Sequence, residues 1–154
     1  MKVLEAKEYG SDVTIAIVAS RFNQDITDAM LNDTLARLKE LEVHSDHVTV
    51  VRVPGAVEIP LIAKHLAASD KYDAIITIGA VIRGETSHFD YVCDQVSQGC
   101  SQVMMQYDLP VVFGVLTTET VEQAQARING KKSYKGREMA DVALEMISLL
   151  QQVK

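Results

Sequence analysis

One short segment gathers the residue types that could bind an anion and move a proton. It runs from Gly79 to Val92 with the sequence GAVIRGETSHFDYV and follows an apolar run over 73–78. Glycines let a backbone approach a ligand closely, and the unpaired N–H groups that open the following helix favour an anion. Glu85 stands where nucleotide-binding phosphate loops carry a lysine, which argues against a nucleoside triphosphate. Because His88 adds an imidazole that titrates near neutrality, the segment predicts a phosphate site with a proton shuttle.

Three further loops are expected to lie at the same edge of a sheet, because ligands of open α/β sheets bind outside the carboxyl ends of the strands. They cover 20–23, 54–58 and 116–118. Phe22 lies in a polar loop, where its ring either tucks under the loop or stacks on a flat ligand. Glu58 opens a helix, where its carboxylate either gains from the helix dipole or accepts hydrogen bonds from a ligand. The residues alone leave both alternatives open.

Strand and helix patterns alternate along the whole chain. The segment 13–19 is apolar on both faces, as expected of a parallel strand covered by helices. Strands are predicted over 13–19, 48–53, 72–78 and 110–116, and helices over 25–42, 57–68, 89–107, 120–128 and 136–153. Thr120 and Gln123 form a capping-box pattern. The alternation predicts a three-layer α/β fold, with a flavodoxin-like four-stranded parallel sheet and helices on both faces.

The two ends of the chain carry further expectations. Residues 1–10 are expected to be an extended arm, because Val3 to Lys7 has too little apolar content to hold its place without a partner strand. The last helix is expected to pack through a narrow apolar seam of Met139, Val142, Met146, Leu149 and Val153. No repeat or linker interrupts the chain, so 1–154 is predicted to be a single domain.

Composition narrows the classes of function. The chain has 154 residues, 47% of them apolar, and a net charge of −6 with no run of basic residues, so no nucleic-acid partner is expected. With no signal-peptide pattern and no long apolar stretch, we expect no membrane and a cytoplasmic location. Cys93 and Cys100 lie about 10 Å apart along a predicted helix, too far for a disulfide. The pair His44 and His47 is expected to lie in a solvated loop rather than to bind metal.

Five segments together resemble the lumazine synthase family in order and spacing, and the resemblance covers essentially the whole chain. The segments are 20–23, 53–58, 79–88, 113–118 and 135–136. The resemblance implies condensation of 5-amino-6-ribitylamino-2,4(1H,3H)-pyrimidinedione with 3,4-dihydroxy-2-butanone 4-phosphate to 6,7-dimethyl-8-ribityllumazine. This is the penultimate step of riboflavin biosynthesis, and it implies no cofactor and no metal.

The resemblance also implies site residues. Phe22 would lie against the pyrimidine ring, and Phe113, Arg127 and Lys135 would complete the site of an adjacent subunit. Further contacts to the pyrimidine substrate and its ribityl chain would come from Ala56, Val57, Glu58, Ala80, Val81 and Ile82. The phosphate would be bound by Glu85, Thr86 and Arg127, with Lys135 in support, and His88 would be the catalytic group that moves protons. Two departures stand out, because Val57 replaces an aromatic residue and 129–134 replaces a more Gly-rich stretch.

The same resemblance implies a homo-oligomer. Members of the family form pentamers, and some go on to form a shell of 60 chains. Riboflavin synthase is a candidate partner. The connection from Arg127 to Lys135 has the length of shell-forming relatives, while its sequence departs from theirs. Two other functions remain open. A flavodoxin-like module could bind flavin mononucleotide without catalysis, since the same loop would hold its phosphate, and a shell subunit could have lost its site.

Overall fold

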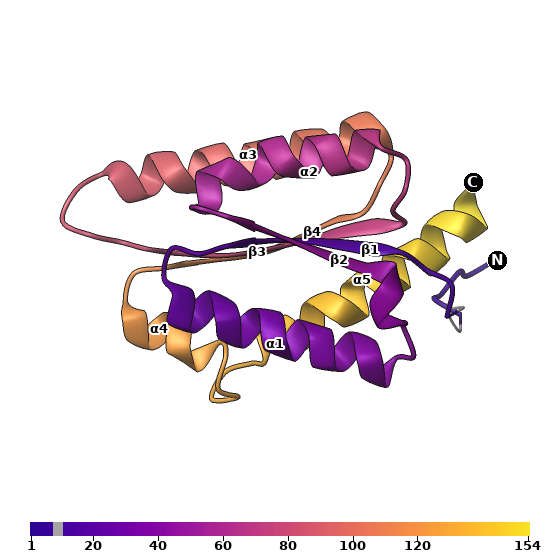
Figure 1. Ribbon diagram of the computed structural model, residues 1–154, viewed down its shortest axis with the longest axis horizontal. Helices are drawn as coiled ribbons and strands as arrows, with labels where there is room; N and C mark the ends of the chain where they lie inside the picture. The colour runs from indigo at the N-terminus through magenta and orange to yellow at the C-terminus, as the bar shows by residue number, and fades with distance from the viewer. Residues whose placement is uncertain (8–10) are drawn as a thin grey trace.

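Parallel strands form the central sheet of the protein (Figure 1). The structure, a computed structural model, describes residues 1–7 and 11–154. In that part of the chain the strands are β1 (Ile15–Ser20), β2 (Val48–Val53), β3 (Ala74–Ile82) and β4 (Val111–Thr118). They pair in parallel in the order β2-β1-β3-β4. The predicted four-stranded parallel sheet is therefore confirmed.

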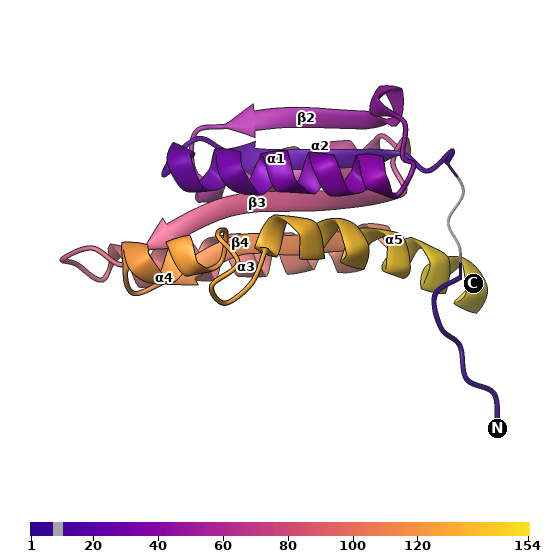
Figure 2. The same ribbon diagram turned by 90° about the horizontal axis from the view of Figure 1, so that it is seen from below.

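Helices cover both faces of this sheet (Figures 1 and 2). One face carries α1 (Gln24–Glu40), α4 (Val121–Ala126) and α5 (Lys135–Val153), and the other carries α2 (Ile59–Ala68) and α3 (His88–Tyr107). Two single 3₁₀ turns, η1 (Ser45–His47) and η2 (Ala56–Glu58), precede β2 and α2. This arrangement confirms the three-layer α/β architecture.

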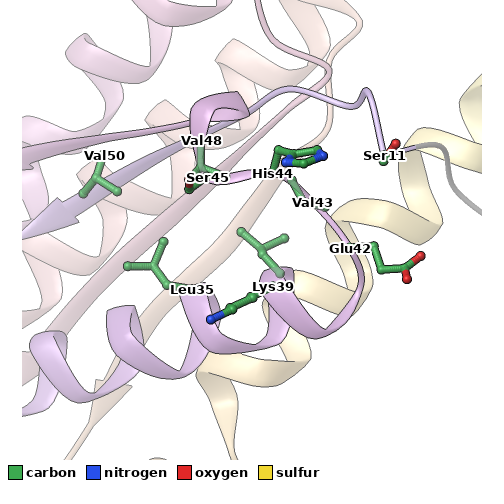
Figure 3. Close-up of a pocket in the computed structure, with 10 residues that line it drawn as sticks. Ser11, Leu35, Lys39, Glu42, Val43, His44, Ser45, Val48 and Val50 are labelled. Carbon is green, nitrogen blue, oxygen red and sulfur yellow. The ribbon is translucent and has the colours of Figure 1, made fainter.

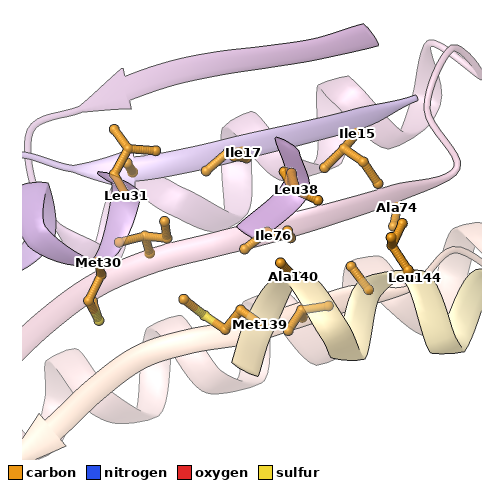
Figure 4. Close-up of a cluster of buried hydrophobic side chains, with 14 of the residues drawn as sticks. Ile15, Ile17, Met30, Leu31, Leu38, Ala74, Ile76, Met139, Ala140 and Leu144 are labelled. Atoms are coloured by element: carbon orange, nitrogen blue, oxygen red, sulfur yellow. The ribbon is translucent and has the colours of Figure 1, made fainter. Parts of the chain in front are cut away.

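The core divides into one apolar layer on each side of the sheet. Every residue of β1 is buried, because β1 lies between two strands and under helices on both faces. Figure 4 shows the larger layer, in which Ile15 and Ile76 face Met139 and Leu144 of α5. Fully burying a side chain of this size contributes about 1.5–3 kcal/mol. The two layers fix the strands whose carboxyl ends carry the candidate site.

The strand β3 is longer than predicted, and the expectation that Gly79 opens the ligand loop is wrong. Gly79 pairs with Val115 inside the sheet, and the ladder continues to Ile82. A Cβ at Gly79 would lie 3.2 Å from the Ser20 hydroxyl oxygen and 3.3 Å from a methyl carbon of Val115. The small size of Gly79 therefore serves close packing, and the loop between β3 and α3 covers only 83–87.

Two helix boundaries also differ from the predicted ones. The helix expected over 120–128 is α4, which ends at Ala126, so Arg127 occupies its C-cap. The chain then turns, and Gly130 has a φ of 85°, in the left-handed region that favours glycine. At the start of the same helix the predicted capping box between Thr120 and Gln123 is confirmed. The helix expected from Val57 begins instead as the η2 turn.

The predicted apolar seam of α5 is wrong in its orientation. Met139 is buried, but Val142, Met146 and Val153 are 44%, 42% and 64% exposed. The buried stripe consists instead of Met139, Ala140, Ala143, Leu144 and Ile147. Two small alanines in this stripe let the helix lie close to its neighbours, which turns Val142 and Met146 outward. These two side chains then border an apolar groove of about 370 Å³ along β4.

Residues 1–7 lie alongside the last turns of α5 and form no strand. The backbone N–H of Lys7 donates to the Ser148 hydroxyl at 2.8 Å, and the Gln152 amide donates to the Glu5 carbonyl at 2.8 Å. Val3 is 69% exposed, and Figure 2 shows the chain leaving the body at this end. The predicted arm also includes 8–10, which lie outside the described residues. In the described part, no helix has the length and apolar content that crossing a bilayer requires.

Candidate active site

The first cavity, which we call the Phe22 cavity, opens at the carboxyl ends of β1 and β3 and has a volume of about 340 Å³. It is mostly apolar, with an imidazole and a hydroxyl at its rim. Its lining residues are Phe22, Gly55, Ala56, Val57, Ala80, Val81, Ile82, Gly84, Thr86, His88, Phe89 and Val92. An apolar cavity with a few polar groups suits a flat organic ligand.

Hydrogen bonds hold the Phe22 loop to the neighbouring strand ends. The N–H groups of Arg21 and Phe22 donate to the Val53 and Pro54 carbonyls at 2.8 and 3.0 Å. The Asn23 side-chain amide donates to the Ala80 carbonyl at 2.8 Å, while Asn23 itself adopts a left-handed φ of 60°. These bonds leave the Phe22 ring 71% exposed. The alternative in which this ring tucks under its loop is therefore wrong, and its faces are free to stack on a ligand.

A short loop and the start of α3 form the polar rim of this cavity. His88 is the first residue of α3, and its N–H donates to the Thr86 hydroxyl at 3.3 Å. The Asp90 N–H donates to the Ser87 carbonyl at 3.0 Å, and the Ser87 side chain caps no N–H group, so the helix dipole and the Phe89 N–H remain for an anion. A Cβ at Gly84 would meet no atom within 4 Å, so a ligand can approach this backbone closely.

Two predicted site residues lie outside the cavity lining. Glu58 ends the η2 turn, where its N–H donates to the Gly55 carbonyl at 3.2 Å, and its carboxylate lies beside Gly55. Gly55 itself lines the Phe22 cavity, so Glu58 borders the cavity without lining it. Glu85 is exposed in the middle of the loop. Glu85 does not line the Phe22 cavity, whereas its neighbours Gly84 and Thr86 do.

The second cavity, the Arg127 cavity, lies under α4 and α5 and has a volume of about 950 Å³. Its lining residues are Phe113, Val115, Leu116, Thr117, Thr118, Glu122, Gln123, Ala126, Arg127, Lys131, Lys132, Ser133, Lys135 and Glu138. Four cationic side chains against two carboxylates favour an anionic ligand. Lys131 and Lys132 were missed as site candidates, although this lysine pair precedes Lys135 in the sequence.

The predicted site residues therefore separate into two sets on one chain. His88 and Phe22 lie together in the Phe22 cavity, whereas Phe113, Arg127 and Lys135 lie together in the Arg127 cavity. No lining residue is shared. The Phe22 cavity takes lining residues from α3 and the Arg127 cavity from α4 and α5, helices that cover opposite faces of the sheet (Figure 1). One chain does not bring the two sets together.

A third cavity, of about 840 Å³, lies between α1 and the edge strand β2 and contains no predicted site residue. Figure 3 shows Leu35 and Lys39 of α1 across from Val48 and Val50 of β2. His44 on its rim is exposed, as expected of a solvated loop. The His44 and His47 rings meet edge to face with centroids 5.9 Å apart. Among residues 1–7 and 11–154, no three side chains of metal-binding type gather in one place.

The fold and the first cavity define a flavodoxin-like α/β protein with a cavity at the carboxyl ends of its parallel strands. The sequence profile of the 6,7-dimethyl-8-ribityllumazine synthase family matches residues 12–151. A 6,7-dimethyl-8-ribityllumazine synthase of Coxiella burnetii strain Dugway 5J108-111 is 53% identical over 144 residues, covering 94% of this chain and 95% of that protein. Those of strains CbuG_Q212 and RSA 493 are each 52% identical over the same shares. The chain belongs to the 6,7-dimethyl-8-ribityllumazine synthase family.

Proposed function

We propose that this chain is a transferase that condenses the ribitylamino-pyrimidinedione with 3,4-dihydroxy-2-butanone 4-phosphate, releasing phosphate and water. Family membership supports the reaction. The observation that carries the proposal is the Phe22 cavity, because it joins an exposed aromatic ring, an imidazole and the open first turn of a helix. The aromatic ring suits a flat heterocyclic amine, the imidazole suits proton transfer, and the first turn of the helix suits a phosphate.

The pyrimidine substrate fits the apolar part of the Phe22 cavity. The exposed Phe22 ring stacks on its heterocycle, while the backbone of Ala56 and Val57 and the β3 residues Ala80 to Ile82 contact its edge and ribityl chain. Glu58, half-buried at the border of the cavity, accepts hydrogen bonds from ribityl hydroxyls. Val57 is smaller than an aromatic residue and 38% exposed, so stacking depends on Phe22 alone on this chain.

The phosphate substrate binds at the first turn of α3. The backbone of Glu85, the hydroxyl of Thr86 and the Phe89 N–H supply hydrogen bonds, and the dipole of α3 adds a favourable field. Arg127 from an adjacent subunit supplies a guanidinium fork that matches a phosphate, and Lys135 adds a second positive charge. Among the described residues Arg127 forms no ion pair, so its charge is free for a ligand.

The reaction needs proton transfers and positioning rather than a protein nucleophile. The pyrimidine amine attacks the ketone to give a carbinolamine, which loses water to form an imine. Loss of a proton from the carbon chain of the phosphate substrate then expels phosphate. The ribitylamino nitrogen closes the ring, and a second water leaves. His88 lies where it can take up and return these protons. The bound geometry replaces a bimolecular encounter, which accounts for much of the expected rate.

Shared sites require an oligomer, and we propose at least a pentamer. Phe113, Val142 and Met146 expose an apolar groove beside the free edge of β4, a surface suited to a second copy. The N-terminal arm of a neighbour could add to the free edge of β2, where Val50 is 37% exposed. A shell of 60 chains with riboflavin synthase as partner, a cytoplasmic location and a single domain over 1–154 belong to the same proposal.

Mixing the purified protein with both substrates and following the lumazine chromophore tests this function. We expect chromophore formation that requires both substrates. Stoichiometric flavin in the purified protein without lumazine formation would favour the flavin-binding alternative, and neither activity nor flavin would favour a decayed shell subunit. Light scattering tests assembly: five chains of 17.0 kDa give about 85 kDa. A fully active monomer would reject the shared site.

A further inference from the structure

One arginine holds together the three segments that surround the candidate phosphate loop. Arg83 is the first residue after β3, and its N–H donates to the Thr118 carbonyl at 3.0 Å. Its guanidinium donates to both carboxylate oxygens of Asp90, at 2.9 and 3.3 Å, and through Nε to Glu119 at 2.6 Å. Its Cζ atom lies 4.5 Å from the centroid of the Phe89 ring. We call this group the Arg83 clamp.

The partners of the clamp belong to elements that carry proposed site residues. Asp90 lies in the first turn of α3, two residues after His88. Glu119 lies between β4 and α4, and its N–H donates to the Gln123 side chain that completes the capping box of α4. The Arg83 clamp thus fixes both ends of the 83–87 loop relative to each other.

Each of the three guanidinium nitrogens of Arg83 already donates to a carboxylate. Both of its donor edges are occupied by Asp90 and Glu119, and its face covers Phe89. Arg83 lines neither the Phe22 cavity nor the Arg127 cavity. Hydrogen bonds to Asp90 and then to Glu119 raise the pKa of Arg83 above its ordinary value, so it stays charged.

We infer that Arg83 is a positioning residue for the phosphate substrate: the Arg83 clamp sets the conformation of residues 84–87 and aims their N–H groups and the first turn of α3 at the phosphate. This inference rests on the proposed function. The clamp adds little to global stability, because its carboxylates are 55% and 59% exposed and exposed pairs are weak. Its loss should therefore change the loop and leave the fold intact.

The test compares Arg83→Met with Asp90→Asn and with a matched control elsewhere on the surface. Arg37 also links two carboxylates, through Nε to Asp141 and through Nη1 to Glu40, both at 2.9 Å. Arg37 lines neither the Phe22 cavity nor the Arg127 cavity, so Arg37→Met removes a comparable ion-pair group from outside both. The readouts are KM for each substrate, binding of inorganic phosphate by calorimetry, thermal midpoint, and particle mass by light scattering.

Arg83→Met and Asp90→Asn are both expected to raise KM for the phosphate substrate and Kd for inorganic phosphate by about tenfold, since small misplacements of binding groups carry losses of this size. KM for the pyrimidine should stay unchanged. Combining Arg83→Met with Asp90→Asn should raise KM for the phosphate substrate no further than Arg83→Met alone. Arg37→Met should have the same thermal midpoint as Arg83→Met. Its KM values for both substrates should equal those of the wild type.

Three outcomes would overturn the inference. If Asp90→Asn bound phosphate as tightly as the wild type or more tightly, Arg83 would be a direct phosphate ligand that Asp90 restrains. An equal rise in both KM values, or a changed particle mass in Arg83→Met, would make the clamp a general structural element. Unchanged phosphate binding in all variants would leave the clamp without a role at the site. A wild type that binds phosphate and forms no lumazine would reject the proposed function alone.

Discussion

Mixing two inactive variants should restore activity if each site is built from two chains. One variant, Phe22→Ala with His88→Ala, disables the Phe22 cavity, and the other, Arg127→Ala, disables the Arg127 cavity. These cavities share no lining residue, so a chain damaged in one retains the other intact. Co-expressed chains can then combine an intact Phe22 cavity with an intact Arg127 cavity at one interface.

The arrangement of the two cavities sets the size of the recovery. In a ring of equal numbers of randomly mixed chains, each site takes one cavity from each of two neighbours, so about a quarter of the sites receive two intact halves. If the Phe22→Ala, His88→Ala variant retains about 1% of wild-type kcat/KM and Arg127→Ala about 1–10%, the mixed assembly should reach at least about 25%. A site contained within one chain would instead give the mean of the two parents, about 1–6%.

Assay of the lumazine chromophore at substrate concentrations near the wild-type KM measures this recovery. Chains are co-expressed with different affinity tags and purified through both tags, which selects mixed assemblies. A matched control mixes the first variant with itself under two tags and should show no recovery. Activity at the parental mean in verified mixed assemblies would refute the division of the site between subunits.

Four further predictions follow from single residues. Arg127→Ala should raise KM for the phosphate substrate by about 10- to 100-fold, because a hydrogen bond to a charged group contributes about 1.5–3 kcal/mol; an equal rise for the pyrimidine would contradict its role. His88→Ala should lower kcat by about tenfold to a thousandfold and leave measurable turnover; complete loss with normal binding would show that positioning does not dominate. Arg137 and then Arg37 lower the pKa of Glu40 from 4.5 to about 2, so its stabilisation is full above pH 4.5 and is lost as the pH falls toward 2; the thermal midpoints of wild type and Glu40→Gln should converge over that range, and a constant difference would refute this. Burial raises the pKa of Cys100 to about 11, so maleimide should label it at pH 8 only after unfolding, and mass spectrometry that finds it labelled in the folded protein would disagree.

The convergence of Phe22, Ala56 and His88 could be predicted from sequence, because the carboxyl ends of parallel strands meet at one edge of a sheet. The extent of β3 could not. Gly79 and the three residues after it look like the start of a glycine-containing loop, and only their pairing with Val115 to Thr118 of β4 makes them a strand. Strand ends depend on a partner that is distant in the sequence.

The orientation of α5 shows the same limit. A stripe through Val142 and Met146 and a stripe through Ala140 and Leu144 are both compatible with the helical period. Burial selected the stripe with the small alanines, because they allow close packing against the sheet and α1. Val142 and Met146 of the other stripe are exposed and form an apolar surface outside the core.

By itself the sequence determined the alternation of strands and helices, the capping box of α4 and the family, because periodicity, caps and motifs are properties of neighbouring residues. The family resemblance implied that Arg127 serves a neighbour's site, and the tertiary structure places Phe22 and Arg127 in separate cavities; only the tertiary structure decided that Arg83 joins Asp90 to Glu119. These relations depend on which face of the sheet each element covers and on side chains that meet across 36 residues of chain. Contacts between residues so distant in the sequence depend on the packing of the whole chain, so a local sequence pattern does not predict them.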